Sequence, residues 1–194
     1  MALLLQEISK KAIHIIILIA LIGYAIIENQ FSQQTALMAL VALLMLFILL
    51  EYFRLELNWK IPFFSQFIRS KERDRMFGVV YFLSATIICL AVFDFRIALA
   101  ALLMTVFGDM LAAIVGKKYG TTLLFRNKTA VGSITELVVN LIVGFAVLIN
   151  FTNVYVILVM ALTATIVEIV VDELDDNLLV PLISGFIGQL LMSI

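Results

Sequence analysis

The sequence predicts an all-α protein, a polytopic membrane helix bundle of about seven transmembrane helices. Three observations predict this fold class. The chain is 64% hydrophobic and only 14% charged, whereas soluble domains are about half apolar and a quarter charged. Seven apolar runs approach the ~20 residues with which a helix crosses a bilayer. Almost all of the cations gather in three of the segments outside these runs. We expect residues 1–194 to form a single integral membrane domain.

The apolar runs give the predicted helices in chain order. They lie at about residues 12–27, 35–53, 76–93, 96–116, 131–149, 153–172 and 177–193. The first run has an alternative interpretation as a signal peptide, because Lys10 and Lys11 precede it and the residues after Ile22 loosely resemble a cleavage site. A multi-span pattern follows it, and we therefore interpret the first run as a transmembrane helix.

The distribution of cations predicts the orientation. Twelve of the thirteen Lys and Arg residues lie in the N-terminal segment and in the loops at about 54–75 and 117–130, and Arg96 alone falls on the other side. Positive loops stay in the cytoplasm. The pattern therefore predicts a cytoplasmic N-terminus, an external C-terminus and a third cytoplasmic loop at about 172–176. A net charge of -1 gives no support for binding nucleic acid, and a single cysteine excludes a disulfide framework.

The loop at 54–75 contains FFSQFIRSKERDR, which is amphipathic and rich in cations. A segment of this kind typically lies at the membrane interface, where its cations contact anionic lipid headgroups. We therefore expect an interfacial helix that contacts lipid headgroups. The same cations could also screen the charge of a nucleotide.

Ionisable residues inside the runs indicate a polar cavity. A charge at the middle of a membrane helix costs ~2.5–3.5 kcal/mol on insertion scales, and such residues usually face a cavity or a partner. Six polar residues lie toward the cytoplasmic side in the predicted topology: Glu51 with Arg54 at the end of the second run, Asp109 in the fourth, Glu136 with the amide of Asn140 in the fifth, and Glu168 in the sixth. A lone histidine such as His14, in the first run, is more often structural than catalytic, but it could also point into the same cavity.

The stretch GDMLAAIVGKKYG (108–120) places a carboxylate, Asp109, in an otherwise apolar helix. Gly116 and Gly120 lie near the same helical face, where small residues permit close approach of another helix or of a ligand. Lys117 and Lys118 follow, and Arg126 and Lys128 lie just beyond. We expect these four cations to bind phosphate.

The segment KTAVGS (128–133) opens the fifth run. A helix N-terminus with a lysine and a glycine, here Gly132, is a natural phosphate site because its backbone N–H groups are free. The sequence contains no Walker A loop, so a nucleotide would be held by another arrangement.

The sixth run ends in ATIVEIVVDELDDN, where four acids recur at helical spacing: Glu168, Asp172, Asp175 and Asp176. Such a stripe is often only a solvated face. Carboxylates also suit Mg²⁺, which commonly bridges one or two of them and the phosphates of a substrate. We therefore expect Asp109, Asp172 and Asp176 to be metal ligands.

These segments together resemble the membrane-embedded polyprenol kinase family, which includes dolichol kinase, phytol kinase and a CTP-dependent diacylglycerol kinase. The matching pieces, in order, are EISKKAIH (7–14), EYFRLE (51–56), GDMLAAIVGKKYG (108–120), KTAVGS (128–133) and VEIVVDELDDNLLVP (167–181). The sequence departs from the family at Val131, where an acid is usual, and Glu136 one turn along could replace it.

The resemblance implies a phosphotransferase that moves the γ-phosphate of CTP, with Mg²⁺, to the hydroxyl of a lipid alcohol on the cytoplasmic side. It implies a core site of Asp109, Lys128, Gly132, Asp176 and Asn177, to which we add Glu168 as a catalytic candidate. Lys10, Lys11, His14, Glu51 and Arg54 would support the site, as would Glu136 and Asn140. The alcohol could be a polyprenol, phytol or diacylglycerol.

Two other functions compete with this interpretation. A phosphatidate cytidylyltransferase also uses CTP and has related segments, but its C-terminal His-Gly-Gly…Asp-Arg signature is replaced here by Asp-Asn-Leu-x-x-Pro. An ion-coupled transporter would also contain intramembrane acids. Against it, the charges are confined to one leaflet and no pair of broken helices in matching halves is present.

Overall fold

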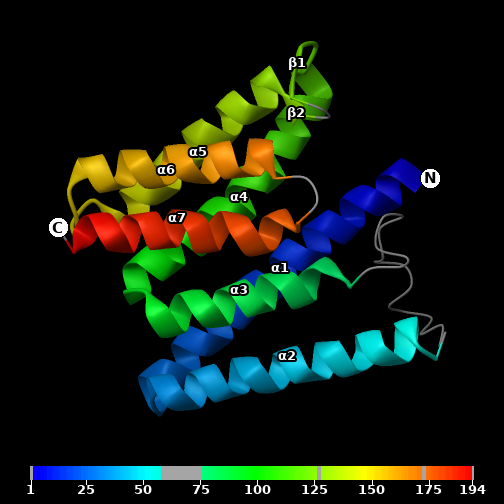
Figure 1. Ribbon diagram of the computed structural model, residues 1–194, viewed down its shortest axis with the longest axis vertical. Helices are drawn as coiled ribbons and strands as arrows, with labels where there is room; N and C mark the ends of the chain where they lie inside the picture. Colours follow the sequence, from blue (N-terminus) through cyan, green and yellow to red (C-terminus); the bar gives the residue numbers. More distant parts are fainter. Residues whose placement is uncertain (1, 58–75, 126–127, 172–173, 194) are drawn as a thin grey trace. The chain divides into compact units, whose positions relative to one another are not determined.

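The computed structural model describes residues 2–57, 76–125, 128–171 and 174–193, with side chains from residue 13 onward. In these residues the chain is helical apart from one short hairpin (Figure 1). The helices are α1 (Ala2–Gln30), α2 (Gln33–Leu55), α3 (Gly78–Val92), α4 (Phe95–Tyr119), α5 (Ala130–Leu148), α6 (Val154–Val170) and α7 (Asp176–Met192). The all-α prediction is confirmed, and the helices correspond closely to the seven apolar runs.

Four helices are long and apolar enough to cross a membrane: α1 from Ile13 to Gln30, α2, α4 and α5. The other three are apolar but shorter, with 15 residues in α3 and 17 each in α6 and α7. At 1.5 Å per residue they are about 23–26 Å long, somewhat less than the ~30 Å hydrocarbon core. The predicted amphipathic segment after α2 lies mostly in residues 58–75, outside the described residues.

The chain divides into two compact units, residues 1–87 and 88–194. No linker marks the boundary in the sequence, because it falls inside α3. In the first unit, α1 packs on α2. The face of α1 that is buried contains Ile13, Ile17 and Tyr24, at the spacing of one helical stripe. Ile15 and Ile19, off that stripe, are apolar and exposed, as expected for a helix surrounded by lipid.

In the second unit, α4 packs against α5, α6 and α7, and α5 and α7 both pack on α6. Figure 1 shows α6 and α7 side by side and the hairpin at the junction of α4 and α5. The core of this unit combines alanines with larger side chains and comprises Ile97, Ala100, Ala101, Met104, Leu148, Val156, Ile157, Met160 and Ala161.

Glycines allow α4 and α5 to approach closely. A Cβ on Gly132 would stand 3.2 Å from the carbonyl oxygen of Ala112, and one on Gly116 would stand 3.4 Å from the Cα of Gly132. On α5 the contact residues Gly132, Glu136, Asn140 and Gly144 recur every four residues. This ridge brings two polar side chains of α5 against α4, where they would otherwise face lipid.

Candidate functional site

A buried cluster of charged side chains lies near the hairpin end of the second unit. Asp109 of α4, Glu136 of α5 and Glu168 of α6 are 8%, 4% and 2% exposed. Lys128 forms an ion pair with Glu168 across 40 residues of sequence. The structure thus brings together acids that the sequence places on three separate helices, and we call Asp109, Lys128, Glu136, Glu168 and Asp176 the acid cluster.

The hairpin and the cap of α5 position Lys128. Strand β1 (Leu123–Phe125) pairs antiparallel with β2 (Lys128–Thr129), with Phe125 opposite Lys128. The hydroxyl of Thr129 then caps α5 by accepting a hydrogen bond from the backbone N–H of Gly132 at 3.1 Å. The hairpin was not predicted from the sequence, and it is the element that carries Lys128 to the cluster.

Negative charge exceeds positive charge around Lys128. Burial opposes the charged form of this lysine, but the carboxylates of Glu168, Asp109 and Asp176 outweigh burial and raise the pKa of Lys128 above its usual range. Lys128 is therefore charged at neutral pH. Glu136 interacts electrostatically with the same acids. In the described part of the acid cluster, four acidic side chains thus surround one ammonium group, an arrangement that favours the binding of further cations.

A second polar layer, formed by Asn140 and Thr165 against Gly108, lies next to the acid cluster on the same three helices. The side-chain amide Nδ2 of Asn140 on α5 donates a hydrogen bond to the hydroxyl Oγ1 of Thr165 on α6 at 3.1 Å. The amide oxygen Oδ1 of Asn140 is buried and has no hydrogen-bond partner among the described residues. It faces Gly108 of α4. Sequence reasoning singled out Asn140 but missed Thr165 and Gly108, because neither is conspicuous in an apolar helix.

The start of α7 holds the acids that follow α6. Asp175 caps this helix, and its Oδ1 accepts hydrogen bonds from the backbone N–H and the side-chain amide of Asn177 at 3.0 and 2.7 Å. Asp176 Oδ1 accepts from the same two groups, each at 3.0 Å. The amide of Asn177 therefore fixes both carboxylates. Asp172 lies outside the described residues.

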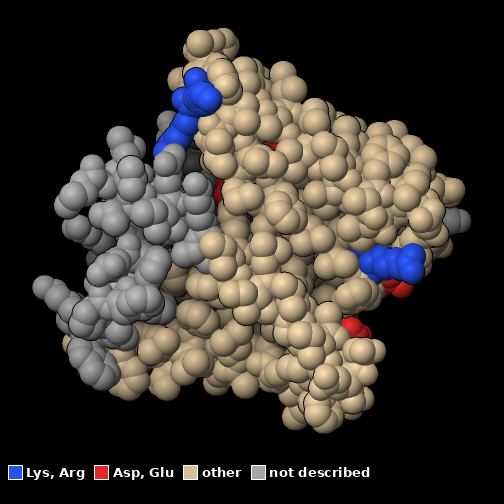
Figure 2. Space-filling model, turned by 180° about the vertical axis from the view of Figure 1, so that it is seen from behind, with Lys and Arg blue, Asp and Glu red and all other residues tan. Residues whose placement is uncertain are grey.

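The other predicted phosphate-binding residues have different surroundings. Lys117 and Lys118 are exposed in the last turn of α4, and the ammonium group of Lys118 lies 5.1 Å from the centre of the Tyr119 ring. Cations in this position stabilise the helix dipole. Among the described residues, few charged atoms are visible on the face shown in Figure 2. Arg126 lies outside the described residues.

The predicted glycines contribute to packing. A Cβ on Gly120 would stand 2.6 Å from a methyl carbon of Thr129, and Gly116 and Gly132 meet at the α4–α5 contact described above. The packing interpretation of these glycines accounts for the geometry. A role in binding a nucleotide stays a prediction.

The predicted supporting residues of the N-terminal half belong to the first unit. Glu51 is buried and accepts hydrogen bonds from Arg54 Nε at 2.9 Å and Nη2 at 2.6 Å. Its Oε2 also accepts from the backbone N–H of Phe77 at 2.9 Å. His14 is buried with its ring edge-on to Phe82, at 6.3 Å between centroids. Lys10 and Lys11 lie on α1, but their side chains lie outside the described residues.

The described residues do not include a group of three or more Asp, Glu, His or Cys placed to hold a metal ion by themselves. Mg²⁺ rarely needs such a group, because one or two carboxylates and the phosphates of a substrate usually complete its coordination. Asp109 and Asp176 are the described residues that could supply such carboxylates, and their role as metal ligands stays a prediction.

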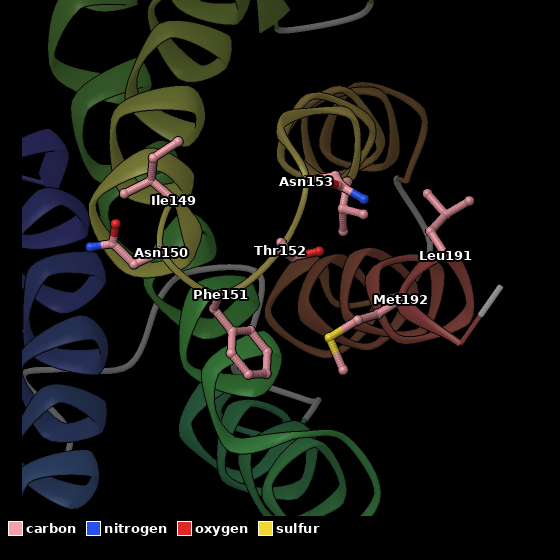
Figure 3. A pocket seen from close by; sticks show the side chains of 8 residues that line it. Ile149, Asn150, Phe151, Thr152, Asn153, Leu191 and Met192 are labelled. Carbon is pink, nitrogen blue, oxygen red and sulfur yellow. The ribbon is translucent and has the colours of Figure 1, made fainter.

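An open pocket of about 460 Å³ lies at the other end of α5, away from Lys128. Figure 3 shows that the turn between α5 and α6 and the end of α7 line it. None of the predicted site residues is among its lining side chains.

Comparisons of the chain with protein-family models, with curated proteins and with solved structures found no match.

Proposed function

We propose that this protein is a membrane lipid kinase that transfers the γ-phosphate of CTP to the hydroxyl of a lipid alcohol. The observation that carries the proposal is a half-buried lysine, Lys128, held among acids from separate helices of an apolar bundle. Phosphoryl transfer needs mainly positioning and neutralisation of charge, and such a cluster can supply both. The resemblance to polyprenol kinases supplies the donor and the class of acceptor.

The proposed orientation follows the cations of the sequence. Seven spans, a cytoplasmic N-terminus and an external C-terminus would place the hairpin and the acid cluster on the cytoplasmic side. CTP is a polar, cytoplasmic molecule, while the acceptor alcohol resides in the membrane. A charged cluster just below the end of apolar helices would suit a reaction between the two, with the lipid entering sideways between the spans.

In the proposed reaction, Lys128 leaves Glu168 and binds the phosphates of CTP, with Lys117, Lys118 and Arg126 adding positive charge nearby. Asp109 and acids at 168–176 would hold Mg²⁺, which would neutralise charge on the phosphates when bound. A carboxylate, Asp109 or Asp176, accepts the proton of the alcohol. The alcohol oxygen bonds to the γ-phosphorus as the bridging bond to the β-phosphate breaks, and CDP leaves with the bridging oxygen.

The decisive experiment supplies purified protein in lipid with Mg²⁺ and CTP labelled at the γ-phosphate or, in parallel, at the α-phosphate. The acceptors are a polyprenol, phytol and diacylglycerol, with phosphatidate as a fourth. We expect γ-label in a lipid monophosphate, with CTP preferred over ATP. Incorporation of α-label into lipid from phosphatidate would instead identify a cytidylyltransferase. Absence of label from every lipid would refute both.

The variant Asp109→Asn tests the assignment of the site. It keeps the size of the side chain and removes its negative charge, so we expect product formation to be abolished while the chain stays folded. Thermal unfolding of the variant provides the control for folding. Unchanged turnover would remove Asp109 from the mechanism.

A further inference from the structure

Three helices each contribute one acid to the acid cluster and one residue to the layer below it. The pairs are Asp109 and Gly108 on α4, Glu136 and Asn140 on α5, and Glu168 and Thr165 on α6. Gly108 adjoins its acid in sequence, Asn140 follows its acid by four residues and Thr165 precedes its acid by three. Contacts that fix Gly108, Asn140 and Thr165 relative to one another therefore also fix the positions of the three acids.

Asn140 contacts both of the other helices in this layer. Its Nδ2 donates to Oγ1 of Thr165 at 3.1 Å, and that hydroxyl donates in turn to the carbonyl oxygen of Ala161 at 3.0 Å. Its Oδ1 lies 2.6 Å from the point where a Cβ on Gly108 would stand. The amide thus fills the space between α4 and α6, and only a glycine at position 108 leaves room for it.

The same glycine also adjoins the acid of α5. The Cγ of Glu136 lies 3.2 Å from the Cβ position of Gly108. Any side chain at position 108 would therefore press on both polar residues of α5. At this level of the helix pair, the distance between α5 and α4 depends on the contact with Gly108.

Stability alone does not explain an asparagine here. Its Oδ1 is buried without a hydrogen-bond partner among the described residues, and an unsatisfied buried acceptor opposes folding. Leucine has a similar volume and would leave no such acceptor. Thr165 would keep its own bond to Ala161 in that case. A directional contact that opposes folding is most useful for setting the register between helices, as polar residues do in the cores of coiled coils.

We propose that Asn140 is a positioning residue: through Thr165 and Gly108 it sets the register of α4, α5 and α6 and thereby the spacing of the acids around Lys128. The inference rests on the proposed kinase activity for its catalytic readout. Asn140 does not contact the reacting atoms. Its effect on the reaction is transmitted through the three carboxylates, and the concentration of Mg²⁺ required for transfer reports on their spacing.

The first experiment compares Asn140→Leu and Thr165→Val with the wild type. We expect the Mg²⁺ concentration for half-maximal transfer to rise about 10- to 100-fold, the range typical of residues that orient metal ligands. We expect the melting temperature of Asn140→Leu to equal or exceed that of the wild type. Thr165→Ser keeps the hydroxyl and should restore the wild-type requirement. Thr86→Val removes another buried hydroxyl, bonded to the carbonyl of Phe82, and should not change it.

The second experiment measures register without using activity. Spin labels at positions 134 and 166, both exposed on α5 and α6, report the distance between the helices in a Cys89→Ala background. We expect Asn140→Leu to shift this distance distribution, with Thr165→Val as the second variant, and Thr86→Val to leave it unchanged. An unchanged distribution in both site variants would overturn the inference, as would a shift without any change in the Mg²⁺ requirement. If the wild type transfers no phosphate, the proposed kinase is wrong, and the label distances alone decide the register.

Discussion

Two ion pairs among the described residues, Glu51–Arg54 and Glu168–Lys128, each have a buried carboxylate but differ in what surrounds them. Arg54 and Glu51 lie one turn apart on α2, and the carboxylate also accepts a hydrogen bond from the backbone of Phe77. Lys128 and Glu168 lie on different elements, and other acids adjoin them. The first pair has its charges balanced locally. The second has a surplus of negative charge.

This difference makes the acid cluster the stronger candidate for a functional site. A balanced buried pair is complete within the fold, and removing one partner exposes the cost of burying the other charge. A cluster with more acidic than basic side chains favours the binding of a further cation. The second unit therefore contains a site at which ligand binding should change stability, whereas the Glu51–Arg54 pair should not respond to ligand.

The largest expected effect comes from removing the single ammonium group of the acid cluster. Lys128→Met should lower phosphate transfer about 10²- to 10³-fold, the usual cost of losing one stabilising group at a site where charge develops. Lys128→Arg should retain part of the activity because it keeps the charge. Arg54→Met is the matched variant in the other pair, and because Arg54 is predicted only to support the site, its activity per folded molecule should fall much less.

The effect of Mg²⁺ on the melting temperature gives a second comparison of the two ion pairs. Without Lys128 the carboxylates repel one another, so Mg²⁺ should raise the melting temperature of Lys128→Met more than that of the wild type. Mg²⁺ should raise the melting temperature of Arg54→Met by no more than it raises that of the wild type. Equal effects of Mg²⁺ on both variants would mean that the two pairs do not differ as argued.

Arg54→Met should be the more destabilising change in the absence of Mg²⁺. It leaves Glu51, which is 1% exposed, without its cation, and breaking a buried pair in this way costs about 3–5 kcal/mol. Denaturant unfolding gives the free energy directly. The double variant Arg54→Met with Glu51→Gln should recover part of it, because the amide carries no charge. Failure of that recovery would show that the lost packing of Arg54, rather than its charge, is responsible.

Two helical glycines provide the next comparison. A Cβ on Gly116 would stand 2.8 Å from Oγ1 of Thr129, whereas a Cβ on Gly23 would have nothing within 4 Å. Gly116→Ala should destabilise the protein by about 1–3 kcal/mol through overpacking. Gly23→Ala should stabilise it by up to about 1 kcal/mol, because alanine favours the helix. Thermal unfolding of both variants checks the signs, and a neutral Gly116→Ala would show that α4 and α5 can separate easily.

Sequence patterns predicted the helices well because their signal is local. Each apolar run is bounded by polar residues, and hydropathy alone locates such boundaries. The positions of Asp109, Glu136 and Glu168 were also recognisable, since a carboxylate in an apolar helix stands out. Their proximity was an inference from topology, and the structure brings these three acids together.

The parts that could not be predicted depend on contacts between distant residues. Lys128 was one of four candidate phosphate ligands, and its place before a helix start distinguished it from Lys118, which is exposed beside Tyr119. The sequence did not predict its ion pair with Glu168. Its position follows from a two-strand hairpin too short to give a strand pattern. Gly108 and Thr165 are ordinary residues of apolar helices. Their role becomes recognisable only from the structure, where the side chain of Asn140 lies between them.

The smallest expected effect compares two helix caps. Thr129 caps α5 next to the acid cluster, and Ser32 caps α2 by accepting from the backbone N–H of Thr35 at 3.2 Å. Replacing either by alanine should cost about 1 kcal/mol of stability. Only Thr129→Ala should also weaken the use of CTP, because the freed turn carries Lys128 and the first N–H groups of α5. Thr129→Ser keeps the cap and should keep both properties. A higher KM for CTP in Thr129→Ala but not in Ser32→Ala would tie the nucleotide to this helix start; equal KM values in the two variants would place the phosphates elsewhere in the acid cluster.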